Sequence, residues 1–100
     1  MNKQEHLLMV VSEEAGEITQ EISKILRFGL DNYNPYEPNK TNEDTLLTEY
    51  YQLVAMMEHL QDIGTLKTLS EERIKEIKKS KIEKVYFYME ESKRQGTLKD

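Results

Sequence analysis

The stretch HLLMVVSEEAGEITQEISKILRFG, residues 6–29, decides the fold of the chain. Its apolar residues recur at the spacing of one face of an α-helix. At about 100° of rotation per residue, four of them lie within about 40° of Ile18. These four are Leu7, Val11, Ile22 and Ile25. The pattern predicts one long helix with a buried apolar stripe.

Charged residues follow one edge of this stripe. Glu14 lies about 40° to one side of Ile18, and Glu21, Glu17 and Lys24 follow on that side at about 60°, 100° and 120°. Carboxylates are rarely buried without a partner, so a row of them along a core edge favours a bound cation. The alternative is a solvated flank in which Lys24 supports the glutamates through pairing along the helix.

The size and composition limit what the chain can bury alone. One hundred residues predict a single domain, residues 1–100. Apolar residues make up 37% and charged residues 33%, with no tryptophan and two phenylalanines, so the core must be mainly aliphatic and small. Oligomerisation is the simplest way to cover the remaining apolar stripes.

Charge and residue usage exclude several classes of partner and site. The net charge of −5 argues against duplex nucleic acid, yet is compatible with a small phosphorylated ligand held through a divalent metal. Without cysteine the chain can form neither disulfides nor thiolate metal sites. The longest apolar run, residues 7–11, is too short for a signal-peptide core or a membrane span. We therefore expect a cytoplasmic protein with no membrane partner.

A loop and a second helix follow. Gly29 stands where a helix C-cap is expected, and residues 30–40 hold both prolines and no periodicity, which is typical of a loop. Thr41 and Asp44 have the spacing of a capping box that opens the second helix, and Gly64 ends it. One face of this helix is apolar and carries Leu46, Tyr50, Leu53, Met57 and Leu60.

The second helix repeats the polar edge of the first. Relative to Leu53, Glu49 lies about 40° to the negative side and Gln52 about 100°, the same offsets as those of Glu14 and Glu17. Equal offsets fall on the same side of the interface when two helices pack antiparallel, and the loop length permits such a hairpin. The four side chains should then converge. Three carboxylates and an amide are hard oxygen donors, which suit Mg²⁺ or Mn²⁺ and not zinc.

A third helix completes the predicted all-α fold. A capping box at residues 68–71 opens it, and it runs to about Arg94, before Gly96. Lys78 and Lys81 project from within its apolar face. Either their stems lie along apolar surface, or they face the acidic edge and meet a phosphate or the carboxylates. We expect an antiparallel helix hairpin plus this third long helix, completed into a helical bundle as a homodimer or homotetramer.

Several motifs together resemble a known family. The pattern Glu13-Glu14-x-x-Glu17, a loop and then Glu49-x-x-Gln52 is similar to that of the all-α, MazG-like nucleoside triphosphate pyrophosphohydrolases. Two further segments resemble the short phage-type members: SKILRFG at residues 23–29, and KIEKVYFYMEES at residues 81–92 followed by GTL at 96–98. The resemblance covers nearly the whole chain.

The resemblance implies an activity and roles for individual residues. Members of the family bind Mg²⁺ through two acidic pairs and cleave a nucleoside triphosphate to the monophosphate and pyrophosphate. It implies that Glu14, Glu17 and Glu49 are metal ligands, together with the residue at position 52. It also implies phosphate contacts for Lys24 and Arg27, and it makes Glu13 and Glu21 additional acids near the attacking water.

The chain departs from the family pattern at Gln52, where the family has aspartate. An amide can coordinate a metal through its carbonyl oxygen, but it brings no charge and accepts no proton. This departure keeps two further hypotheses open: a protein on the same scaffold that captures a nucleotide without hydrolysing it, and a helical assembly module whose acidic edge is structural.

Overall fold

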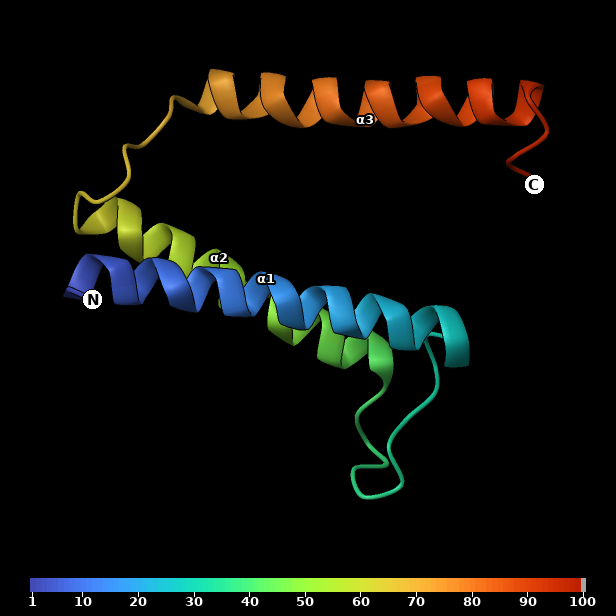
Figure 1. Ribbon diagram of the computed structural model, residues 1–100, viewed down its shortest axis with the longest axis horizontal. Coiled ribbons are helices and arrows are strands. Elements are labelled where there is room, and N and C mark those ends of the chain that lie inside the picture. Colours follow the sequence, from blue (N-terminus) through green and yellow to red (C-terminus); the bar gives the residue numbers. More distant parts are fainter. Residues whose placement is uncertain (100) are drawn as a thin grey trace. The chain divides into compact units, whose positions relative to one another are not determined.

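The computed structural model describes residues 1–99, and these residues form three α-helices and no strand. The helices are α1 (Lys3–Phe28), α2 (Asn42–Asp62) and α3 (Glu71–Arg94), as Figure 1 shows. The all-α prediction is therefore confirmed. The chain divides into two compact units, Met1–Lys67 and residues 68–99, and the expectation of a single domain stays a prediction. No helix within the described residues has the length and apolarity needed to cross a membrane.

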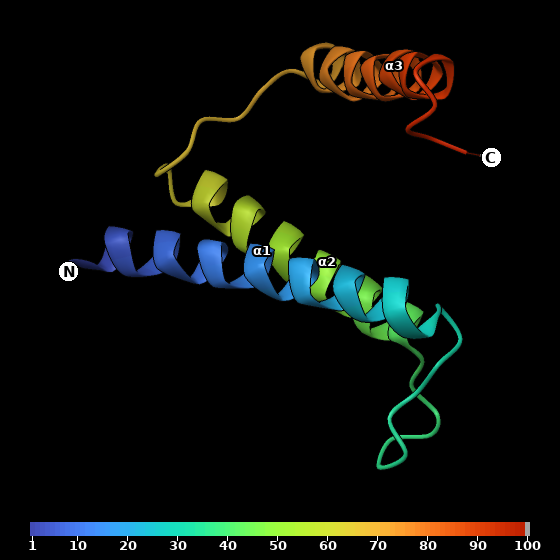
Figure 2. The ribbon, with the colours of Figure 1, turned by 45° about the vertical axis from the view of Figure 1, so that its right-hand side comes forward.

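The first unit is an antiparallel hairpin of α1 and α2, which lie side by side in both ribbon views (Figures 1 and 2). Gly29 ends α1 with a φ of 91°, a backbone conformation that glycine adopts without steric cost, and its N–H donates to the Ile25 carbonyl at 2.7 Å. The Asn42 side-chain amide donates to the Gly29 carbonyl at 3.0 Å and joins the two helix ends. These local signals fix where the hairpin turns.

The start of α2 matches its sequence signature. The Thr41 hydroxyl accepts the Asp44 N–H at 3.2 Å, and the Asp44 carboxylate accepts the Thr41 N–H at 3.0 Å. Both halves of the predicted capping box are therefore present. Gly64, which has a φ of 82°, follows the last turn of α2, again as predicted.

The interface of the hairpin follows a seven-residue repeat. Apart from Val10, the buried and partly buried residues of α1 recur at alternating steps of four and three, at Leu7, Val11, Glu14, Ile18, Glu21 and Ile25. A matching series in α2 consists of Leu46, Glu49, Leu53, Met56 and Leu60. This spacing is the signature of two helices packed along a continuous seam. Three of the eleven seam positions are glutamates, which is unusual for a helix interface.

The second unit contains α3, and its N-cap differs from the predicted one. Ser70 caps the helix, with its hydroxyl accepting the Arg73 N–H at 3.1 Å, so the capping box predicted at residues 68–71 is wrong. A cap at Ser70 places Glu71 and Glu72 in the first turn, where their charges interact favourably with the helix dipole. The structure describes every residue of α3, and none of them is buried.

Candidate metal site

Three carboxylates from two helices occupy the seam of the hairpin. Oε2 of Glu14, Glu21 and Glu49 is buried in each case, and none of the three atoms has a hydrogen-bond partner among residues 1–99. We call these atoms the unpaired oxygens. A buried acceptor without a donor is destabilising by about 1–3 kcal/mol relative to a satisfied one. Three such atoms lie in one small hairpin.

Glu21 is the most buried of the three. Its exposed fraction is 4%, the lowest of any charged residue that the structure describes. Its Oε1 accepts from the Lys24 ammonium at 3.0 Å, within one turn of α1. About half of the Lys24 side chain, 52%, is exposed, and Oε2 of Glu21 remains without a hydrogen-bond partner among the described residues.

The pKa of Glu49, on α2, is raised above its ordinary value, and the charges that act on it all lie on α1. Loss of water around its carboxylate raises this pKa most, and the negative charges of Glu21, Glu17 and Glu14 raise it further, while Lys24 lowers it. The α1 glutamates therefore face the same space as the α2 glutamate. The convergence of Glu14, Glu17, Glu49 and Gln52 on one centre stays a prediction.

The pKa of Glu14 is raised as well. Loss of water is again the largest cause, followed by the charge and proximity of Glu17 and then the charge of Glu13. A carboxylate with a raised pKa is one whose negative charge is poorly compensated. A positive charge placed in this seam would interact favourably with both Glu14 and Glu49.

The register of the hairpin brings Glu21 beside Glu49. The bond between Asn42 and Gly29 sets these two residues level with each other. Stepping eight residues back along α1 and eight forward along α2 covers about 12 Å on each helix, at about 1.5 Å per residue. Glu21 is then level with residue 50, next to Glu49. The order in which the α1 glutamates act on Glu49, with Glu21 first and Glu14 last, agrees with this register.

The other residues predicted for the metal and the catalytic acid lie outside the seam. Glu13, Glu17 and Gln52 are exposed, in agreement with their larger offsets from the apolar stripe. Glu17 lies one turn of α1 before Glu21, and its side chain is exposed to solvent. Gln52 lies one turn of α2 from Glu49. None of these three side chains contributes a buried polar atom without a hydrogen-bond partner.

The predicted phosphate contacts fall in both units. Lys24 and Arg27 lie in the last turns of α1, and the Arg27 guanidinium sits over the Phe28 ring at 5.2 Å from its centroid. Lys78 and Lys81 are exposed on α3, in the second unit. The structure therefore pairs only Lys24 directly with a carboxylate of the seam.

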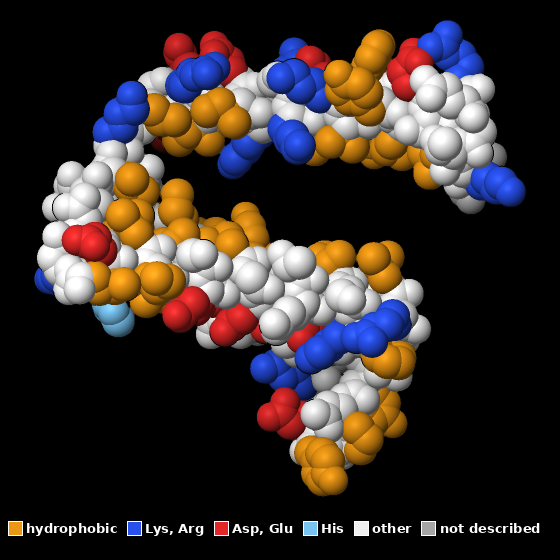
Figure 3. All heavy atoms as spheres, viewed as in Figure 1, with side chains coloured by type: hydrophobic (Ala, Val, Ile, Leu, Met, Phe, Trp, Pro, Cys, Tyr) orange, Lys and Arg blue, Asp and Glu red, His pale blue; other side chains and the backbone are white. Residues whose placement is uncertain are grey.

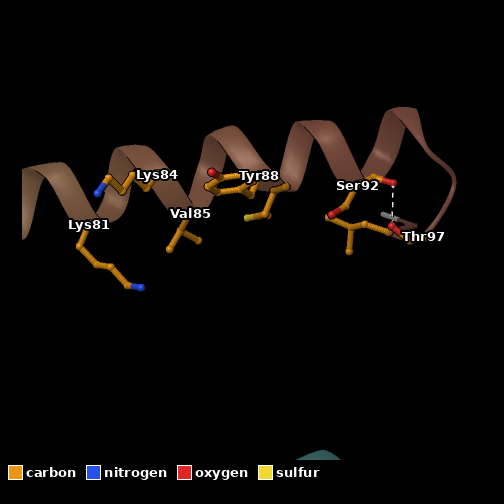
Figure 4. Close-up of a pocket in the computed structure, with 8 residues that line it drawn as sticks. Lys81, Lys84, Val85, Tyr88, Ser92 and Thr97 are labelled. Atoms are coloured by element: carbon orange, nitrogen blue, oxygen red, sulfur yellow. Dashed lines mark hydrogen bonds between the residues drawn. The ribbon is translucent and has the colours of Figure 1, made fainter.

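Lys81 also borders a hollow on the surface of α3. The hollow has a volume of about 550 Å³, and Figure 4 shows Lys81 and Lys84 at one end and Ser92 and Thr97 at the other. The Thr97 hydroxyl donates to the Ser92 carbonyl at 3.2 Å, which turns the residues after α3 back toward the helix. Val85 lines the same hollow, and both readings of Lys78 and Lys81 stay open.

Carboxylate oxygens are suitable ligands for a divalent cation, but the side-chain rotamers of these glutamates do not form a coordination site. No group of three or more histidine, aspartate or glutamate side chains within residues 1–99 is arranged so that it could hold a metal ion. The donors are nevertheless carboxylate oxygens, which Mg²⁺ and Mn²⁺ prefer. Ion binding in this seam requires the glutamates to rotate toward a common centre.

Comparisons of the chain with protein-family models, with curated proteins and with solved structures find no match.

Sequence reasoning placed Glu21 too far from the core. At about 100° per residue, Glu21 lies farther from the apolar stripe than Glu14. In a seam that repeats every seven residues, one residue corresponds to about 103°, and Glu14 and Glu21 then lie equally close, at about 51° from Ile18. The signal that identifies Glu21 is its spacing of seven from Glu14 and of fourteen from Leu7.

Proposed function

We propose that the protein is a Mg²⁺- or Mn²⁺-dependent nucleoside triphosphate pyrophosphohydrolase, which converts an NTP or dNTP to the monophosphate and pyrophosphate. The observation that carries the proposal is the set of three unpaired oxygens in the α1–α2 seam. Two helices contribute them, as the paired acidic motifs of the MazG-like proteins would require. The motif resemblance supplies the reaction class, and the buried carboxylates supply the reason to expect a metal.

Selection for stability alone would not keep glutamates in these seam positions. Leucine or isoleucine at the same positions would bury apolar surface and leave no oxygen without a donor. Residues that weaken a fold are commonly retained where function needs them. In Figure 3 acidic side chains gather along one edge of the hairpin and hydrophobic side chains along the other, so the acidic groups form one local surface.

The residues around the seam have separate roles in the proposed reaction. Glu14, Glu17 and Glu49 hold the metal, with the amide of Gln52 as a neutral donor. Mg²⁺ in such a site neutralises phosphate oxygens and lowers the pKa of bound water. Lys24 and Arg27, in the last turns of α1, contact the phosphates of the substrate.

In the proposed reaction, a glutamate of α1 accepts the proton of the attacking water; the candidates are Glu13, which is exposed, and Glu21, which is buried. Glu13 or Glu21 would orient the attacking water and accept its proton. Attack by water at the α-phosphorus breaks the bond to the bridging oxygen, which leaves with pyrophosphate.

A second candidate function is nucleotide capture without hydrolysis. The observation that favours it is Gln52, which removes one negative charge and one proton acceptor from the acidic edge. The two functions differ in their products. An enzyme releases pyrophosphate, whereas a capturing protein returns the intact triphosphate after denaturation.

We also propose that the bundle is completed by oligomerisation, as a homodimer or homotetramer in the cytoplasm. Exposed apolar residues line the side of the hairpin opposite to the carboxylates. They lie about 40° to 80° from the centre of each stripe, on its positive side. They are Leu8, Ile22 and Leu26 of α1 and Tyr50 and Met57 of α2. A second copy that packed against this side would cover them. Light scattering after gel filtration gives the mass, and a monomeric mass would contradict this part of the proposal.

The test of the proposed reaction is a panel of NTPs and dNTPs incubated with the protein in Mg²⁺ or in EDTA. We expect Mg²⁺-dependent formation of equal amounts of monophosphate and pyrophosphate, measured by chromatography. Glu49→Gln should abolish it, because this change removes the only α2 carboxylate of the seam. Glu58→Gln is the matched control, since Glu58 is an exposed glutamate on the same helix. Binding of a nucleotide without any product would favour capture instead.

A further inference from the structure

We propose that Glu21 supplies the carboxylate that position 52 lacks, so that Glu21 and Glu49 together form the centre of the cation site. This inference depends on the proposed metal site and changes its ligand set. The sequence pattern assigns that site to Glu14, Glu17, Glu49 and Gln52. The structure instead gives the central position to a glutamate outside both motifs.

The burial of Glu21 is the first argument. Its exposed fraction of 4% means that more than nine-tenths of this residue is removed from water. One of its carboxylate oxygens has no hydrogen-bond partner within the described chain. A solvated flank would leave such a side chain free to turn toward water. Gln52, by contrast, is exposed and has no buried atom that needs a partner.

The position of Glu21 is the second argument. The helix register places it level with residue 50 and therefore next to Glu49, whereas Glu14 lies two turns away along α1. Each of the two glutamates brings one unpaired oxygen to the seam. A divalent ion between them would satisfy both atoms at once. Glu17, one turn from Glu21, would then reach the same ion from the solvent side.

Lys24 acts as the internal counterion of this pair. Its ammonium lies 3.0 Å from Oε1 of Glu21, and its side chain is half exposed. A monovalent ammonium on one oxygen offsets only part of the charge on two carboxylates. Lys24 would be free to turn outward and contact a phosphate if a bound cation compensated Glu21 in its place. The pair therefore links metal binding to the availability of a phosphate contact.

The experiment measures Mn²⁺ binding to the metal-free protein by calorimetry and by electron paramagnetic resonance, with no nucleotide present. We expect Glu21→Gln to weaken Mn²⁺ binding by about tenfold or more, the loss that even indirect metal contacts cause. Gln52→Ala should change it far less. Glu58→Gln is the control for the loss of one negative charge from the hairpin.

The outcomes separate this inference from the proposed function. Mn²⁺ binding that survives Glu21→Gln but is lost in Gln52→Ala would overturn the inference and leave the metal site standing. If the natural protein binds no Mn²⁺ at all, both proposals fail. Circular dichroism of each variant in EDTA checks the fold. We expect Glu21→Gln to keep its helical signal, because the change removes a buried charge and preserves side-chain volume.

Discussion

Replacing Glu49 by methionine should stabilise the metal-free protein and remove its response to Mg²⁺. Glu49 occupies a seam position between Leu46 and Leu53 of α2, and its Oε2 is buried without a partner in the described chain. Methionine has a similar volume and rotamer freedom but no polar atom, so it fits the seam without a cavity. The substitution also removes the repulsion between Glu49 and Glu21.

The expected magnitude follows from the unpaired oxygen. An unsatisfied buried polar group is destabilising by about 1–3 kcal/mol. In a domain of this size, 1 kcal/mol corresponds to a shift of about 4–8 °C in the midpoint of thermal unfolding. We therefore expect Glu49→Met to raise this midpoint in EDTA by at least about 4 °C. In Mg²⁺ the natural protein should gain stability as the ion binds its folded state, whereas the variant should not.

The assay is thermal unfolding followed by circular dichroism at one fixed protein concentration, in EDTA and in Mg²⁺. Glu58→Met is the control, because it removes the same charge from an exposed position of α2 and should change stability by less than about 0.5 kcal/mol. If Glu49→Met lowers the midpoint in EDTA, the carboxylate is satisfied in the native protein. If the variant responds to Mg²⁺ as the natural protein does, the ion binds elsewhere. Either result refutes the reasoning.

Three further predictions concern the edge of the seam, its titration and the cap of α2. Gln52→Asp should tighten Mg²⁺ binding and raise turnover at limiting Mg²⁺, because it adds a charged donor beside Glu49; unchanged affinity in a metal titration would remove position 52 from the site. The pKa values of Glu14 and Glu49 are raised above 4.5, so the folded protein binds protons that the unfolded chain has released. Stability in EDTA should then increase as the pH is lowered from neutrality toward 4.5, and a midpoint that falls over this range would show that the charges are compensated. Asp44→Ala should lower the thermal midpoint by about 4–8 °C, since the Thr41 N–H loses a hydrogen bond worth about 1 kcal/mol; an unchanged midpoint would mean that the Thr41 side chain alone is enough to cap the helix.

The helices and the turn of the hairpin could be predicted from the sequence because their signals are local. Gly29 ends α1, and Thr41 with Asp44 opens α2, as side-chain and backbone hydrogen bonds within four residues dictate. The start of α3 was the exception. Thr68 and Ser70 are both hydroxyl residues that can cap a helix, and the sequence does not distinguish between them.

The sequence by itself also determined which edge of each helix is acidic, since helical rotation alone fixes the direction in which Glu14 and Glu49 point. Only the tertiary structure decided that Glu21 is the most deeply buried carboxylate. The exposure of a side chain depends on what lies opposite to it, and the level at which α2 passes Glu21 is set by the hairpin register. The seven-residue repeat of two packed helices then brings Glu21 into the seam, which the geometry of a single helix does not reveal.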